Sequence, residues 1–137
     1  VPADHKIVTR HGVEITVRVS DATVWVSSLD NQPIVESKHL LVTHLTDCQN
    51  TEIKYAEKTR KTLLAWGKTP HLIRAGKAEV RVKLKDPAAM KVYALATSGK
   101  RLGNVPSKVE GGALVFTADV AGAAKDQTAV MCYEIAP

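Results

Sequence analysis

The sequence predicts an all-β fold, an antiparallel β-sandwich of the jelly-roll or immunoglobulin-like kind with about nine or ten short strands. Three observations support this prediction. Apolar and polar residues alternate over short segments, most clearly in 13–19 and 77–85. Turn-forming residues separate these segments about every 8 to 12 positions, the spacing typical of sandwiches. No segment has the period of a long helix, and no strand–helix–strand unit or internal repeat is present.

The first strands are predicted from alternation and turn residues together. Segment 13–19 places four β-branched residues on one face and polar residues on the other. His11 and Gly12 can turn this strand back on segment 6–9, which makes a first hairpin. A further strand is expected at 23–27, and the polar cluster 29–33 should end it in a turn.

The middle of the chain contains one strongly apolar strand and one long polar stretch. Segment 39–45 is nearly continuous in apolar and β-branched residues, as expected of an interior strand covered on both sides. Segment 47–61 is polar without a clean period, which predicts a long, partly ordered loop. A strand should resume at 62–65, and residues 66–70 should form a turn.

The last part of the chain repeats the strand pattern. Segment 77–85 directs small and branched residues inward and charged residues outward, and Asp86-Pro87 ends it. Further strands are expected at 90–95, 113–117 and 130–135.

Length and composition indicate a single domain over residues 1–137. With 137 residues, 45% of them hydrophobic, a normal core can form without metal or disulfide crosslinks. No apolar run approaches the ~20 residues needed to cross a bilayer, so no membrane association is expected. The chain begins at Val1 rather than Met, and we expect it to be a module excised from a larger enzyme. Cys48 and Cys132 are expected to be free thiols, with a single bridge as the alternative.

The sequence contains no recognisable catalytic or metal-binding constellation. Most aspartates fall in turns or at strand ends, where they are ordinary turn formers. The five histidines lack ligand spacing, and His39 and His44 should face opposite sides of their strand. A calcium ion near Asp47, Asn50 and Glu52 is left open, since these residues offer hard oxygen ligands. The chain is therefore predicted to be no enzyme, with no cofactor and no metal.

The net charge of +5 raises the question of an anionic partner. The best basic stripe consists of Lys77, Arg81, Lys83 and Lys85, with Arg74 nearby. Glu79 interrupts it and few aromatic residues accompany it, which favours a solvated strand face over a nucleic-acid site. An anionic polysaccharide would be attracted by the same charge.

Aromatic residues supply the candidate sugar-binding positions, because a flat ring can cover the apolar face of a pyranose. Trp25 should point away from the valines on either side of it, so it lies on an outer face if those valines are core. A second candidate cluster combines Trp66 with Tyr55, His71 and Arg74. The alternatives are a packed Trp25 and a Trp66 that plugs the long loop. The other aromatic residues are predicted to be core: Tyr93, Phe116 and Tyr133.

The order of several short motifs resembles the C-terminal β-sandwich of large bacterial glycoside hydrolases, agarase-like enzymes among them. The likeness covers roughly residues 23–135. Its motifs are Ser28-Leu29-Asp30-x-x-Pro33-Ile34-x-x-Ser37-Lys38-His39-Leu40-Leu41-Val42-Thr43, Gln49-Asn50-Thr51, Trp66-Gly67, Pro70-His71-Leu72-Ile73, Val92-Tyr93-Ala94-Leu95-x-x-x-Gly99-Lys100-Arg101, Val105-Pro106 and Tyr133-Glu134-Ile135.

The resemblance implies a non-catalytic carbohydrate-binding module of a secreted or cell-surface polysaccharide-degrading enzyme. Its expected partners are a polysaccharide or oligosaccharide and the attached catalytic domain, and the module should be a monomer. Binding through one or two stacked rings should be weak, in the high micromolar to millimolar range. The alternative is a structural accessory domain that packs on the catalytic barrel without binding glycan; it predicts an exposed apolar patch.

Overall fold

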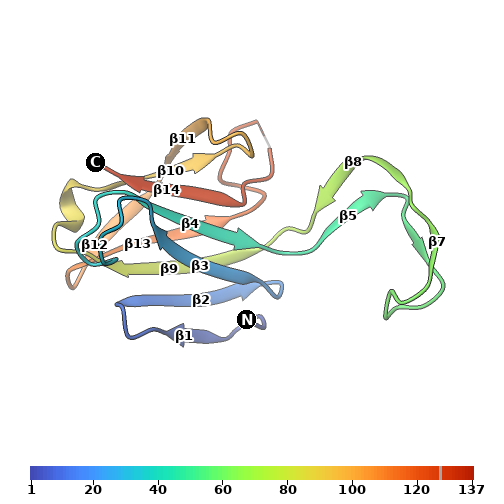
Figure 1. Ribbon diagram of the computed structural model, residues 1–137, viewed down its shortest axis with the longest axis horizontal. Coiled ribbons are helices and arrows are strands. Elements are labelled where there is room, and N and C mark those ends of the chain that lie inside the picture. Colours follow the sequence, from blue (N-terminus) through green and yellow to red (C-terminus); the bar gives the residue numbers. More distant parts are fainter. Residues whose placement is uncertain (127) are drawn as a thin grey trace.

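The computed structural model describes residues 1–126 and 128–137 and confirms the antiparallel β-sandwich. Two five-stranded sheets stack face to face (Figure 1). We call them the N-terminal sheet, in the order β1-β2-β9-β13-β12, and the C-terminal sheet, in the order β11-β10-β14-β4-β3. The strands of the N-terminal sheet are β1 (Lys6–Val8), β2 (Val13–Val19), β9 (Lys77–Lys83), β12 (Ser107–Glu110) and β13 (Ala113–Asp119).

The C-terminal sheet contains the strongly apolar strand predicted for the interior. Its strands are β3 (Thr23–Ser28), β4 (Leu40–Leu45), β10 (Lys91–Leu95), β11 (Arg101–Val105) and β14 (Cys132–Ala136). Strand β4 lies between β3 and β14, and all but two of its side chains are buried. The only helical element among the described residues is a short 3-10 turn, η1 (Pro87–Ala89), and no described helix is long and apolar enough to cross a membrane.

A long hairpin between β4 and β9 projects from one end of the sandwich (Figure 1). We call residues 47–74 the arm. Its base is a ribbon of β5 (Cys48–Thr51) with β8 (Lys68–Ile73), and its outer part pairs β6 (Lys54–Tyr55) with β7 (Leu63–Ala65). The predicted loop at 47–61 is therefore wrong over its first half. No second layer covers either face of the ribbon. Its sequence therefore needs no alternation of apolar and polar residues, and it shows no strand period.

The described residues form 14 short strands rather than nine or ten. The difference comes from elements whose sequences are polar or short. Strands β5 and β6 lie in the predicted loop, and β12, with all four side chains exposed, pairs with β13 although it has no buried face. Edge and ribbon strands of this kind are held by backbone hydrogen bonds to a neighbouring strand. Such strands need no alternation of apolar and polar residues, so the sequence pattern does not indicate them.

The core lies between the two sheets and is built mostly of valine, leucine and alanine. The inward residues of β9 are Ala78, Val80 and Val82, all with no exposed surface, which confirms the predicted phase of that strand. Phe116 and Tyr133 are buried with ring centroids 5.6 Å apart, as predicted for core aromatics. Tyr93 is only half-buried and lies beneath the Arg101 guanidinium, 3.8 Å from the ring centroid, so it departs from that prediction.

Both cysteines are free: Cys48 is exposed on the arm and Cys132 is half-buried in β14. The predicted turn after β3 forms around Asp30. The Asp30 carboxylate accepts hydrogen bonds from the Ser28 and Ser37 hydroxyls, at 2.7 Å each, and from the Lys38 backbone N–H at 2.8 Å. These donors hold the pKa of the Asp30 carboxyl well below its usual range.

Candidate functional site

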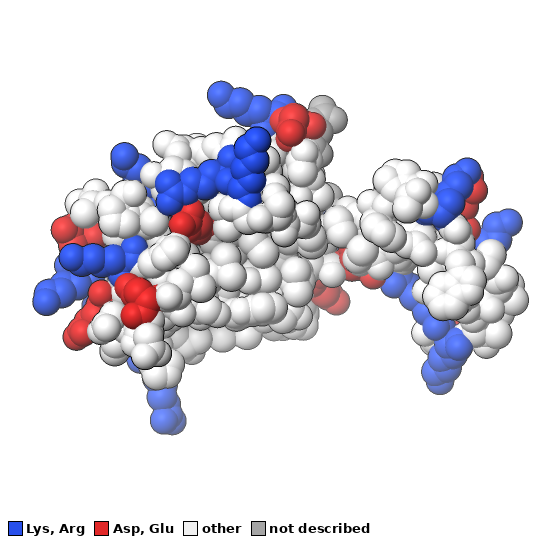
Figure 2. Space-filling view, turned by 45° about the horizontal axis from the view of Figure 1, so that its top comes forward, with Lys and Arg blue, Asp and Glu red and all other residues white. Residues whose placement is uncertain are grey.

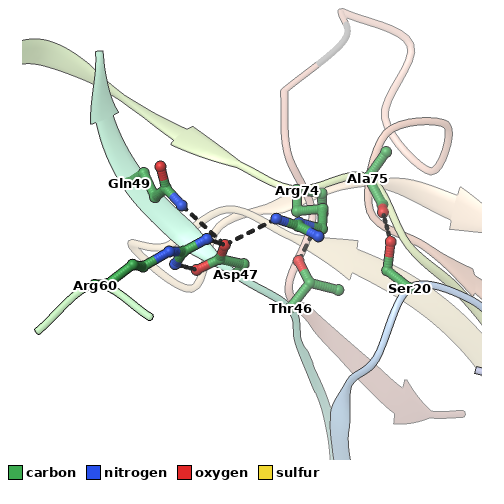
Figure 3. A network of polar contacts seen from close by, with 7 residues as sticks. All are labelled: Ser20, Thr46, Asp47, Gln49, Arg60, Arg74 and Ala75. Atoms are coloured by element: carbon green, nitrogen blue, oxygen red, sulfur yellow. Dashed lines mark hydrogen bonds and ion pairs between the residues drawn. The ribbon is translucent and has the colours of Figure 1, made fainter. Parts of the chain in front are cut away.

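Separate parts of the arm are held together by a group of polar contacts around Asp47 (Figure 3). The Asp47 carboxylate accepts from both terminal nitrogens of Arg60, at 2.9 and 2.6 Å, and from Arg74 at 3.2 Å. The Gln49 amide adds a fourth contact at 3.1 Å. Because Arg60 belongs to the turn between β6 and β7 and Arg74 follows the end of β8, one carboxylate ties three parts of the arm together. A bidentate guanidinium contact also fixes direction, which a single point charge would not.

The Arg60 guanidinium, with help from Gln49 and Arg74, lowers the pKa of the Asp47 carboxyl to about 2. A depressed folded pKa means that the stabilisation is complete above the ordinary Asp value near 4 and is lost as the pH falls from about 4 through about 2. The contacts around Asp47 should therefore be lost over this pH range, and the arm should loosen.

Asp47→Asn should reproduce this loosening at neutral pH. The neutral amide cannot accept a charge-assisted bidentate contact, so we expect backbone amides of the arm to exchange several times faster, with little change in the sandwich. Hydrogen exchange resolved by peptide measures this. Asp86→Asn is the control, since Asp86 is exposed and follows the end of β9 opposite to the arm. If the amides of the arm exchange at the same rate in Asp47→Asn and wild type, Asp47 does not hold the arm together.

The backbone around Trp66 is held in place although its side chain is not. The Asn50 side-chain amide donates to the Trp66 carbonyl oxygen at 2.9 Å, and the Asn50 Oδ1 accepts from the His71 Nδ1 at 2.7 Å. Gly67 follows with φ of 71°, and its α-carbon faces the backbone of residues 51–53 so closely that a Cβ would lie 2.2 Å from the Thr51 carbonyl oxygen. The close approach of two backbones at this bend requires glycine.

The Trp66 side chain is 76% exposed, more than any other large hydrophobic side chain described. Leu64 and Leu72 on the same arm are also exposed, whereas Tyr55 lies opposite Leu63 across the ribbon and is half-buried. An apolar ring of this size is normally covered, and exposing it on an ordered hairpin leaves a large apolar surface in water. Such a surface is typical of a binding element.

The structure places the predicted site residues in two regions. Trp66 and His71 meet through Asn50, and Tyr55 lies further out on the same arm. Arg74 is at the arm base, bound to Asp47, and does not join them. The alternative that Trp66 plugs a loop does not hold, because the indole is largely in solvent.

Trp25 is far from the arm cluster in the fold, on the edge strand β3. It is 43% exposed beside a buried Val24, as expected for an outward-facing residue, and its strand partner is Thr43 of β4. The same outer face carries a network that the sequence did not indicate. The Glu134 carboxylate accepts from His39 at 2.7 Å and from Arg101 at 2.6 Å, and Arg101 stacks on Tyr93. Only the cross-strand register, invisible in sequence, brings these residues together.

The basic stripe on β9 is partly neutralised. Lys77 pairs with Asp119 at 3.0 Å, and Arg81 lies 3.5 Å from the Glu110 carboxylate. Acidic side chains from β13 and β12 thus form ion pairs with two of its positive charges, which agrees with a solvated strand face.

The residues considered for calcium are engaged by cations instead. Asp47 binds Arg60 and Arg74, and Glu52 pairs with Lys68 at 2.9 Å. Within residues 1–126 and 128–137, no three His, Cys, Asp or Glu side chains are grouped as a metal would require. Comparisons with protein-family models, curated proteins and solved structures return no match to this chain. The resemblance to glycoside hydrolase sandwiches therefore stays a prediction.

Proposed function

We propose that the protein is a carbohydrate-binding module that holds polysaccharide against the arm, with Trp66 as the stacking platform. The observation that carries the proposal is the 76% exposure of an indole whose backbone is fixed on both sides, by Asn50 and by Gly67. Because the backbone is fixed, only the rotamer freedom of the side chain is lost when a sugar stacks on the ring. The polar groups beside it, His71 and Asn50, can hydrogen-bond to hydroxyls of the same sugar.

The expected energetics agree with weak, reversible binding. Covering about 100 Å² of apolar ring surface contributes about 2.5 kcal/mol at about 25 cal/mol per Å². Two or three solvent-exposed hydrogen bonds add about 1 kcal/mol each. After the cost of association, dissociation constants in the high micromolar to millimolar range are expected.

Trp66→Ala should weaken binding at least about 10-fold in the assay that finds a glycan ligand, with no change in the melting temperature. Affinity electrophoresis against a panel of plant and algal polysaccharides identifies the ligand, and calorimetry with its oligosaccharides gives the affinity. Trp25→Ala is the matched control, since it removes the other tryptophan from the sandwich edge. Full binding by Trp66→Ala, or no binding to any glycan by the wild type, would overturn the proposal.

A second candidate function is supported by the exposed leucines of the arm. Leu64 and Leu72 are 65% and 53% exposed, and aliphatic side chains suit a protein partner such as an attached catalytic domain. If the arm docks on that domain, Leu64→Ser and Leu72→Ser should weaken the domain contact while glycan binding stays at the wild-type level. Size-exclusion chromatography of the two domains mixed in trans measures it.

A further inference from the structure

We infer that the arm selects anionic glycans, chains bearing carboxylate or sulfate groups, over neutral ones. The inference rests on the proposed function and names its substrate class. It is carried by the exposed Trp66 ring together with Lys54, Lys58 and Lys61 of the same projecting hairpin, three lysines that form no ion pair with any described residue.

The arm concentrates the positive charge of the protein. Residues 47–74 contain six basic and three acidic side chains, so this stretch carries +3 of the total net charge of +5. Figure 2 shows blue side chains at several places on the projecting arm, with red ones beside some of them. Because the hairpin projects into solvent, an approaching polyanion meets this positive charge before it meets the sandwich. The charge can therefore steer the polyanion to the arm.

The charges that remain available lie toward the outer part of the arm. Arg60 and Arg74 are used by Asp47, and Lys68 by Glu52. Among the described residues, no ion pair involves Lys54, Lys58 or Lys61, and all three side chains are exposed. The base of the arm is thus neutralised internally, while its outer part presents three ammonium groups.

The outer part of the arm is ordered enough to keep these groups together. Lys54 in β6 pairs with Ala65, the residue before Trp66. Lys58 and Lys61 belong to the connecting turn, which two hydrogen bonds close. The Ala56 N–H donates to the Thr62 carbonyl oxygen at 3.0 Å, and the Thr62 N–H donates to the Glu57 carboxylate at 2.6 Å. The three lysines therefore belong to the short hairpin that Trp66 directly follows, along which a polysaccharide chain stacked on the indole can extend its acidic substituents.

A polynucleotide is the less suitable polyanion for this surface. Sequence-tolerant binding of single strands uses several aromatic platforms for successive bases, and the arm presents one open ring, since Tyr55 is half-buried. One ring with flanking cations matches a single sugar residue with charged substituents.

Two matched pairs of glycans test the inference with the wild-type chain. Polygalacturonate and highly methyl-esterified pectin differ in the carboxylate charge, and κ-carrageenan oligosaccharides and their desulfated form differ in sulfate. We expect the charged member of at least one pair to bind at least about 10-fold more tightly at low salt, with a preference that declines as salt is raised. The pair that shows the preference identifies carboxylate or sulfate as the recognised group.

The variants separate this inference from the proposed function. Replacing Lys54, Lys58 and Lys61 together by Gln should remove the preference and flatten the salt dependence, while binding to a neutral glycan stays. The control replaces Lys83, Lys91 and Lys100 by Gln, three exposed lysines of the sandwich, and should change affinity less than about 2-fold. Equal, Trp66-dependent binding of charged and neutral glycans would overturn the inference and leave the proposed function standing. Binding to no glycan overturns both, and tighter binding to an oligonucleotide overturns the choice of glycan.

Discussion

Gly67→Ala is expected to abolish glycan binding while the sandwich stays folded. Gly67 has φ of 71°, and an added Cβ would lie 2.2 Å from the Thr51 carbonyl oxygen and 2.6 Å from the Ile53 nitrogen. Both contacts are with backbone, so no side chain can rotate to relieve them, and the left-handed φ adds strain of its own. The β5–β8 ribbon must open at this point, which separates Trp66 from Asn50 and His71.

The readouts distinguish local from global damage. Calorimetry with the identified glycan should show no heat, and hydrogen exchange should accelerate in the arm. The melting temperature of the sandwich should stay within a few degrees of wild type, because the arm contributes no residue to its core.

Gly99→Ala is the matched control for Gly67→Ala. Gly99 also has a positive φ, of 84°, but no atom lies within 4 Å of an added Cβ. It therefore carries the conformational cost without the backbone collision, and binding should be unchanged. If Gly67→Ala binds glycan as well as Gly99→Ala does, the ribbon geometry around Trp66 does not position the ligand.

The elements predicted well are those in which one face is buried and the other is wet. Strands β2 and β9 have strict alternation, and their inward residues are buried in the structure, because a shift of one residue would reverse every side chain. The exception is Val19, which is exposed at the end of β2, where the register shifts between Val17 and Val19. The arm is the opposite case. Strands β5 and β8 are held by backbone pairs and by Asp47, so their residue types were free to be polar. Periodicity cannot detect a ribbon that covers no core.

The candidate site could be predicted only in part, for a related reason. The exposure of Trp66 depends on a hairpin leaving the sandwich, and its neighbour His71 is brought to it by Asn50, a residue the sequence suggested only as a calcium ligand. The Glu134 network is set by the pairing of β14 with β4 and β10, elements separated by many residues in the chain. Tyr93 was assigned to the core because it neighbours apolar residues, yet its register places it on the outer face.

His44 should make the sandwich sensitive to mild acid. Its side chain has no exposed surface, and neither ring nitrogen has a hydrogen-bond partner among the described residues. Burial lowers the pKa of His44 below its ordinary value near 6.5, although the Asp119 charge and the nearby Ala118 backbone oppose the shift. With a depressed folded pKa, the unfolded chain binds the proton first. Stability is therefore complete above about pH 6.5 and declines as the pH falls below it.

His44→Leu should raise the free energy of unfolding by about 1 to 3 kcal/mol at neutral pH, because an apolar side chain of similar size removes an unsatisfied buried polar group. It should also flatten the decline that begins below about pH 6.5, which starts above the acid transition expected for Asp47. Urea unfolding at several pH values measures both effects. His11→Gln, on an exposed turn, should leave the pH profile as it is in wild type. A His44→Leu protein that is less stable at pH 7, or that keeps the wild-type decline, would show that the buried imidazole is satisfied in solution.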